Sequence, residues 1–270
     1  MMTTDKSLPT KDGPMKFFPI LLSAFLCFGC AAKKIAAQNA DVILVSQMEK
    51  RLPLYSEQKK VLSKDVDKFL NDQKSFTQEA LPLISSFELD ISKVDQQYDR
   101  LNALYRQLAS NFSSLMSKHM APLDEKQQKE FMTTLTEENR KRSKIGGTEQ
   151  MKKVYDRFET LFGSIGDGQK KILKAQKNYI IQRGELRLKR REKLHSQIKE
   201  VYNMDLSPEG RQKYFLGAFN DYQDSYPDSP KNKEIIKEII TSLSATQKEV
   251  FKEKVGELVE ILNYYLDTDY

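Results

Sequence analysis

The side chains in this sequence that are best suited to chemistry are two thiols and two imidazoles. Cys27 and Cys30 lie in one apolar stretch near the start, so nothing from residue 31 onward can form a disulfide or a thiolate metal site. His119 and His195 are far apart in sequence, and neither belongs to a metal-ligand pattern such as His-Glu-x-x-His. We therefore expect no metal ion and two ordinary histidines at helix surfaces or boundaries.

The apolar stretch that holds both cysteines has the features of an export signal. Read from Met15, it has Lys16 at its start, apolar residues over 17–28 and small residues at its end. About 20 apolar residues are needed to cross a bilayer as a helix, and this run is shorter. The pattern predicts an export signal rather than a permanent membrane span.

The end of this signal, LCFGCAA at residues 26–32, resembles a bacterial lipobox, in which a small residue precedes a cysteine that is linked to diacylglycerol. Gly29 matches the small position and Cys30 the lipidated cysteine. The resemblance implies several acyl chains, which anchor a protein almost permanently. Because Ala31 and Ala32 follow the cysteine, it also implies the periplasmic face of the outer membrane. Without lipidation, cleavage near Ala32 would release a soluble periplasmic or secreted protein.

Positive charge is concentrated in two segments, RKRSK at 140–144 and RGELRLKRREK at 183–193. On a helix, the arginines of the second segment would share one broad stripe. Such a stripe suits lipid headgroups, an anionic envelope polymer or an acidic protein. The alternative is a solvated helix face, partly paired with neighbouring glutamates. The residues of this candidate anion-binding site are Arg183, Arg187, Lys189, Arg190 and Arg191.

No pattern in the chain points to catalysis or to nucleic acid. A Gly-rich phosphate loop, a Gly-x-Ser-x-Gly elbow and a metal-ligand cluster are all missing from the sequence. Glycosidase carboxylates can lie far apart in sequence, so a cell-wall enzyme stays open as an outside alternative. Export would also separate the protein from nucleic acid, and the chain shows no aromatic-interleaved platform for single strands. We expect a protein that is not an enzyme, needs no cofactor and binds no nucleic acid.

The elements that must position these residues have the composition of an all-helical protein. The chain has only 11 Gly and 9 Pro in 270 residues, which favours helix over sheet. From Ile91 to Leu115, apolar residues recur at steps of three and four, which predicts a long amphipathic helix. We expect an all-α fold, an elongated multi-helix bundle with long amphipathic helices. Helices are predicted near 56–80, 90–120, 124–143, 148–162, 168–202, 207–222, 231–241 and 244–266.

A short pattern recurs at the starts of several predicted helices: a hydrophobic residue, then a capping residue, then a glutamine. In a capping box, the cap accepts from free backbone N–H groups and the glutamine reaches back to the cap. We expect each leading hydrophobe to dock its helix on a common core, although capping boxes are also generic stabilising devices. The clear cases are LDEKQ at 123–127 and LSATQ at 243–247, and looser forms are LYSEQ at 54–58, IGDGQ at 165–169 and LSPEGRQ at 206–212.

Several segments together resemble an uncharacterised family of Gram-negative all-helical lipoproteins, a domain of unknown function. They are the lipobox around Cys30, QEALPLI at 78–84, LFGSIGDGQKKI at 161–172 and SLSATQKEVF at 242–251. The LSATQ start is also similar to helix starts of the Spy/CpxP-type periplasmic chaperones and stress sensors. The first resemblance implies an envelope lipoprotein, and the second implies a binder of unfolded envelope proteins.

These expectations combine into one organisation of the chain. Residues 1–30 are an N-terminal extension and lipoprotein signal peptide, 31–40 are a tether and 41–270 are a single helical domain. The predicted function is that of a membrane-anchored periplasmic lipoprotein with a structural or partner-binding role in the bacterial envelope. The predicted partners are the membrane, through the lipid anchor, and an envelope protein or anionic envelope polymer. A chaperone-like binder of unfolded envelope proteins is the alternative, and the oligomeric state is open.

Overall fold

The computed structural model describes residues 30–225 and 229–270. These residues form eleven α-helices and one short 3₁₀ helix, with no strand among them, which confirms the predicted all-α class. The helices are α2 (Cys30–Gln38), α3 (Ala40–Glu49), α4 (Ser56–Ser85), η2 (Ile91–Lys93), α5 (Val94–Met120), α6 (Glu125–Ser143), α7 (Gly147–Phe162), α8 (Asp167–Ala175), α9 (Lys177–Asn203), α10 (Pro208–Asp224), α11 (Pro230–Ser242) and α12 (Ala245–Asp267).

Most predicted helices are present, with three differences. Helix α4 continues past Pro82 to Ser85, although a proline at this position removes the hydrogen bond to the carbonyl oxygen of Gln78. The helix predicted over 168–202 is two helices, α8 and α9, which meet at Gln176. Helices α2 and α3 were not predicted, since the four consecutive apolar residues 42–45 hide the helical period.

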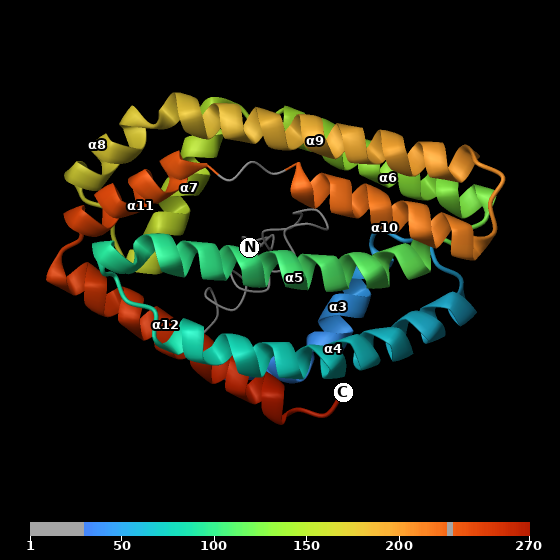
Figure 1. Cartoon of the computed structure of the whole chain (residues 1–270), viewed down its shortest axis with the longest axis horizontal. Coiled ribbons are helices and arrows are strands. Elements are labelled where there is room, and N and C mark those ends of the chain that lie inside the picture. The colour runs from blue at the N-terminus through green and yellow to red at the C-terminus, as the bar shows by residue number, and fades with distance from the viewer. Residues whose placement is uncertain (1–29, 226–228) are drawn as a thin grey trace, which may run out of the picture.

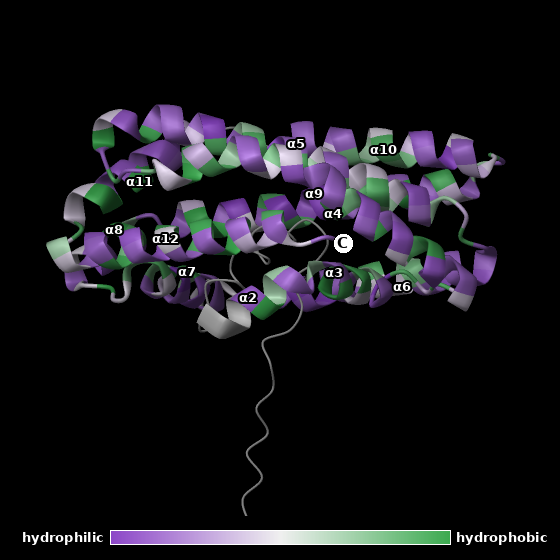
Figure 2. Cartoon of the chain, turned by 90° about the horizontal axis from the view of Figure 1, so that it is seen from below, coloured by the Kyte–Doolittle hydropathy of each residue, from purple (hydrophilic) through white to green (hydrophobic). Residues whose placement is uncertain are grey.

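The helices form an elongated bundle, and the contacts between neighbouring helices make a closed ring (Figure 1). Contacts run from α5 to α10, then to α9, α7, α12 and α4, and from α4 back to α5. Helix α6 packs on α9, and α3 packs on α4. In the view of Figure 2, α5, α10 and α11 lie along one side of the molecule, and α7, α2, α3 and α6 lie along the other.

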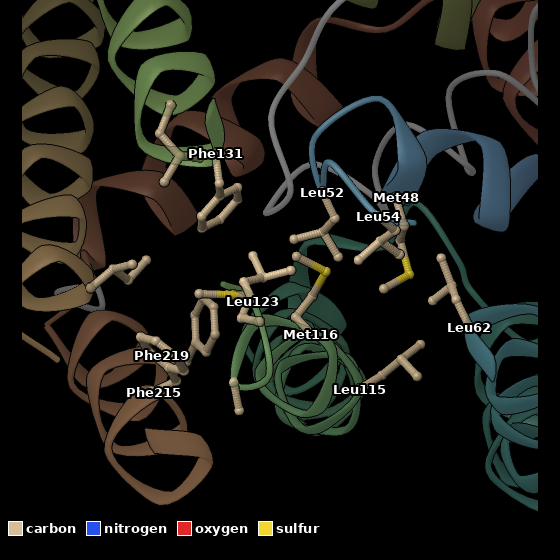
Figure 3. Packing of buried hydrophobic residues seen from close by; sticks show 14 of the residues in the cluster. Met48, Leu52, Leu54, Leu62, Leu115, Met116, Leu123, Phe131, Phe215 and Phe219 are labelled. Carbon is tan, nitrogen blue, oxygen red and sulfur yellow. The ribbon is translucent and has the colours of Figure 1, made fainter. Parts of the chain in front are cut away.

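Two separate hydrophobic clusters lie along the bundle rather than one common core. The larger cluster joins α3, α4, α5, α6, α9 and α10, and includes the fully buried Phe131 and Phe215 (Figure 3). The smaller one joins α7, α8 and the end of α11 through Met151, Phe158 and Leu243. Helix α12 reaches both, because its residues Phe251 and Tyr265 pack on the smaller and the larger cluster respectively.

The segment expected to be a tether, residues 31–40, is instead part of the folded body. It is helical from Cys30 and contacts α12 and α3. Ala37 and Ala40 are buried, and the hydroxyl of Tyr270 donates a hydrogen bond to the carbonyl oxygen of Ala37. The small residues that suggested a flexible linker are the ones that let this helix pack closely.

Candidate functional site

The first pair of glutamine motifs brings the starts of α4 and α6 together. Gln127 is buried, and its Nε2 donates to Gln58 Oε1 at 2.6 Å and to the carbonyl oxygen of Pro53 at 2.7 Å. Each glutamine oxygen also accepts from its own cap, from Tyr55 N at 2.9 Å and from Asp124 N at 3.1 Å. The Tyr55 hydroxyl donates to Asp124 Oδ2 at 2.9 Å. We call this network the α4/α6 clamp.

The second pair repeats the arrangement at the starts of α8 and α12. Gln169 Nε2 donates to Gln247 Oε1 at 3.2 Å and to the carbonyl oxygen of Ser242 at 2.6 Å. Gln247 Nε2 donates to the carbonyl oxygen of Ser164 at 2.9 Å. Both glutamines are buried, and their oxygens accept from Gly166 N and Ser244 N. We call this network the α8/α12 clamp.

Four of the five recurring patterns therefore serve to join helix starts in pairs. Their leading hydrophobes are buried two by two, Leu54 and Leu123 in the larger cluster and Ile165 and Leu243 in the smaller one. This corrects the expectation of one common core. The fifth pattern differs, because Ser207 caps α10 by accepting from Gly210 N and its glutamine joins neither clamp.

The candidate anion-binding stripe on α9 is divided between the interior and the surface. Arg190 and Arg191 are each only 7% exposed, so they do not belong to an exposed basic face. Arg187 and Lys189 are exposed, and Arg183 is half-buried. The helical period that placed the arginines together is the reason, since it also turns the end of the stripe onto the face that packs against α6 and α10.

Arg191 is held in a buried polar network between α6, α9 and the turn that follows α3. Its Nε donates to Asn139 Oδ1 at 3.0 Å and its Nη2 to Glu138 Oε2 at 3.3 Å, while Arg51 Nε donates to Glu138 Oε1 at 3.1 Å. Burial lowers the pKa of Arg191 from its ordinary value. Two guanidinium groups thus share one carboxylate, which joins α6 to α9 and to the turn after α3, and this is a structural role.

Arg190 points to α10 and binds its C-terminal end. Its Nη2 donates to the carbonyl oxygen of Tyr222 and its Nε to Ser225 Oγ at 2.8 Å. The guanidinium carbon lies 4.5 Å from the centre of the Tyr222 ring, a cation–π contact. A cation near carbonyl groups at the end of a helix is also favoured by the helix dipole. Arg190 therefore fastens α9 to α10.

The two histidines lie in different buried surroundings. Asn139 Nδ2 contacts His195 Nδ1 at 2.9 Å, and since Asn139 Oδ1 accepts from Arg191, the amide donates to an unprotonated Nδ1. Burial and the charge of Arg191 lower the pKa of His195 to about 4, so the ring is neutral at pH 7. His119 is buried rather than at the surface, with Nε2 3.0 Å from Asp65 Oδ2.

Burial also lowers the pKa of His119 from its ordinary value, although Asp65 acts in the opposite direction. Across residues 30–225 and 229–270, no group of three or more His, Cys, Asp and Glu side chains is placed to hold a metal ion. None of the helices in those same ranges is long and apolar enough to cross a membrane.

The lipidation candidate, Cys30, is the first residue of α2, and its side chain lies outside the described part of the chain. Cys27, Gly29 and the rest of the export signal lie outside it as well. What the structure adds is the place of the following helix. Lys34 Nζ lies 4.9 Å from the centre of the Tyr264 ring, so α2 is fixed on α12 from near its first turn.

Comparisons with protein-family models, with curated proteins and with solved structures found no match to this chain. The resemblance to a family of Gram-negative helical lipoproteins therefore stays a prediction.

Proposed function

We propose that this protein is a lipid-anchored component of the bacterial envelope, with a structural or partner-binding role and no catalytic activity. The observation that carries the proposal is the lipobox-like LCFGCAA, whose second cysteine is the first residue of a helix that is docked on the body. A lipid on Cys30 would hold the whole bundle at the membrane surface, without a flexible tether between the two. The proposed place is the periplasmic face of the outer membrane.

The test of the anchor is the intact mass of the protein extracted from membranes, beside a Cys30→Ala variant. We expect a chain that starts at Cys30 and carries acyl mass, and a variant that loses both the acyl mass and the membrane association. An unmodified chain that begins after Ala32 would overturn the anchor and indicate a freely diffusing protein.

Partner binding through α9 is supported by the exposed Arg187 and Lys189. Arg190 and Arg191 are left unchanged in the test, because replacing a buried charged partner destabilises the fold itself. Arg187→Glu with Lys189→Glu should reduce the partners that co-purify with the protein. Lys193→Glu with Lys199→Glu, exposed positions on the same helix, is the control. If both double variants co-purify with the same partners as the unsubstituted protein, α9 is removed from the proposal.

A chaperone-like binder of unfolded envelope proteins is the second candidate function. It is favoured by the exposed Val42, which lies beside Val45 in a shallow hollow between α3 and α4 that is also lined by Asp41, Ser46, Glu49 and Ser63. Ile35 on α2 and Val61 on α4 are exposed as well. Exposed apolar surface of this kind suits promiscuous binding. The chain from residue 30 should then suppress aggregation of an unfolded protein, and no suppression at stoichiometric excess would exclude this function.

A further inference from the structure

We propose that the side of the molecule that carries α2 is a membrane-contact surface. Its cationic corner, where α6 ends and α7 begins, binds anionic phospholipid headgroups. This inference rests on the proposed function, because it takes Cys30 as the point where the chain meets the lipid.

The proposed lipid anchor lies a short distance from the folded body. Helix α2 has nine residues, which at about 1.5 Å per residue makes it roughly 13 Å long. It is docked on the body by the contact of Lys34 with the Tyr264 ring and by the hydrogen bond from Tyr270 to Ala37. A lipid on Cys30 would thus bring the adjoining surface of the bundle to the headgroups.

Helix α2 shares its side of the molecule with several other helices. In Figure 2, α7, α2, α3 and α6 lie along one side of the molecule, while α5, α10 and α11 lie along the opposite side. Helix α2 contacts α3 and α12, and α12 in turn contacts α7. The ends of α6 and α7 that face each other are therefore on the same side as the anchor.

The corner where α6 ends and α7 begins carries a concentration of positive charge. Between residues 140 and 153 the sequence has six basic residues and one acid, Glu149. Among these bases, Lys141 lies 4.0 Å from Glu137 and Lys153 lies 2.9 Å from Glu149. A cluster of cations beside a lipid anchor is typical of proteins that bind anionic membrane surfaces. The exposed members of the cluster are Arg140, Lys141, Lys144, Lys152 and Lys153.

The cationic corner has a fixed position on the bundle. A Cβ atom at Gly147 would lie 2.6 Å from Ile181 Cδ1, and one at Gly184 would lie 2.5 Å from Gln150 Oε1. The two glycines thus let the start of α7 approach α9 closely. Gln150 Nε2 also donates to the carbonyl oxygen of Ile145 at 3.3 Å, which closes the turn between α6 and α7.

Apolar side chains are exposed on the helices near the proposed anchor. Ile35 on α2 is 60% exposed and Val42 on α3 is 59% exposed. Apolar side chains next to cations are the combination by which proteins rest in the interface of a bilayer. The pair would lie at the level of the headgroups, with the cationic corner to one side.

The test measures binding of the chain from residue 30, carrying Cys30→Ser, to vesicles of phosphatidylglycerol and phosphatidylethanolamine. Both hydrophobic clusters are built from residues 40 onward, so this chain keeps them. We expect co-sedimentation at low salt that is lost in 0.5 M NaCl, and none with phosphatidylcholine vesicles. Each cation near an anionic surface contributes about a fivefold change in affinity. Arg140→Glu, Lys144→Glu and Lys152→Glu together should therefore weaken binding at least tenfold.

The matched control is Arg100→Glu, Lys213→Glu and Lys231→Glu, three exposed cations on α5, α10 and α11. It changes the net charge equally, and we expect less than a twofold effect. Equal losses in the two triple variants, or no binding to phosphatidylglycerol, would overturn the inference. Single Lys144→Glu and Lys152→Glu variants replace the triple if circular dichroism shows lost helix. An acylated Cys30 with no such binding would leave the proposed function standing.

Discussion

At one end of the molecule Gln58 and Gln127 join α4 to α6, and at the other Gln169 and Gln247 join α8 to α12. The two clamps have the same hydrogen-bond logic but rest on clusters of different size. The α4/α6 clamp lies on the larger cluster, with Phe131 and others, whereas the α8/α12 clamp lies on the smaller one. Because the smaller cluster buries fewer side chains, we expect the α8/α12 clamp to contribute a larger share of the local stability than the α4/α6 clamp.

The clamps also differ in the side chain that caps one helix of each pair. Asp124 caps α6 by accepting from Gln127 N at 2.9 Å, and Ser244 caps α12 by accepting from Gln247 N at 3.2 Å. The other cap in each pair, Tyr55 or Gly166, provides no side-chain acceptor. One clamp therefore contains a charge that titrates, and the other does not.

The largest expected effect is the loss of an aromatic side chain from either cluster. Phe215→Ala should lower the free energy of unfolding by about 3–5 kcal/mol, because Phe215 is fully buried against Tyr202. Phe158→Ala should instead open α7, α8 and α11 locally before the rest unfolds. Denaturant titration combined with hydrogen exchange distinguishes the two, and a uniform loss of protection after Phe158→Ala would contradict two independent clusters.

The next effect concerns the clamp glutamines. Gln127→Ala and Gln247→Ala should each cost about 2–3 kcal/mol, since each leaves buried donors and acceptors unpaired. The matched control is Gln212→Ala, the glutamine of the fifth pattern, with an expected change below about 0.5 kcal/mol.

The pairing itself is tested by a double-mutant cycle in the α8/α12 clamp. Gln169→Ala combined with Gln247→Ala should cost about 1 kcal/mol less than the sum of the single changes, because the two side chains bind each other. Additive losses, measured by denaturant titration, would mean that the glutamines act only as separate helix caps.

The smallest effect separates the clamps by pH. Hydrogen bonds from Gln127 N and from the Tyr55 hydroxyl hold the pKa of Asp124 below its usual range. A carboxyl with a lowered pKa in the folded state stabilises the fold above its unfolded pKa of about 3.9 and loses this contribution as the pH falls further. Between pH 6 and pH 3, protection factors at the start of α6 should fall more than those at the start of α12. Asp124→Ser should abolish the difference.

The sequence predicts the helices of this fold well, because their apolar residues follow the helical period and their starts carry caps. It does not reveal that the motifs ending at Gln58, Gln127, Gln169 and Gln247 bind each other. Partners separated by 69 or 78 residues leave no local signal. The capping box is visible in one segment, but the partner is decided by how the long helices between them return.

The sequence predicts the candidate binding site less well than it predicts the helices. The spacing of Arg187, Arg190 and Arg191 predicts a shared stripe, but no local rule says how far along α9 the packing extends. Arg190 and Arg191 belong to the interior because α6 and α10 offer Glu138, Asn139 and the Tyr222 carbonyl there. The exposed corner over 140–153 had a signal in RKRSK, and only the fold shows that it lies on the side of α2.

The docking of α2 also has a consequence for the order in which the protein assembles. The helix that follows Cys30 is held by α12, by the Tyr264 ring and by the Tyr270 hydroxyl, all from the last part of the sequence. A chain made from its N-terminus forward completes this helix long before the residues that hold it exist. During synthesis and any export, α2 therefore lacks its contacts with α12 and stays accessible to processing enzymes until residues 245–270 have been made.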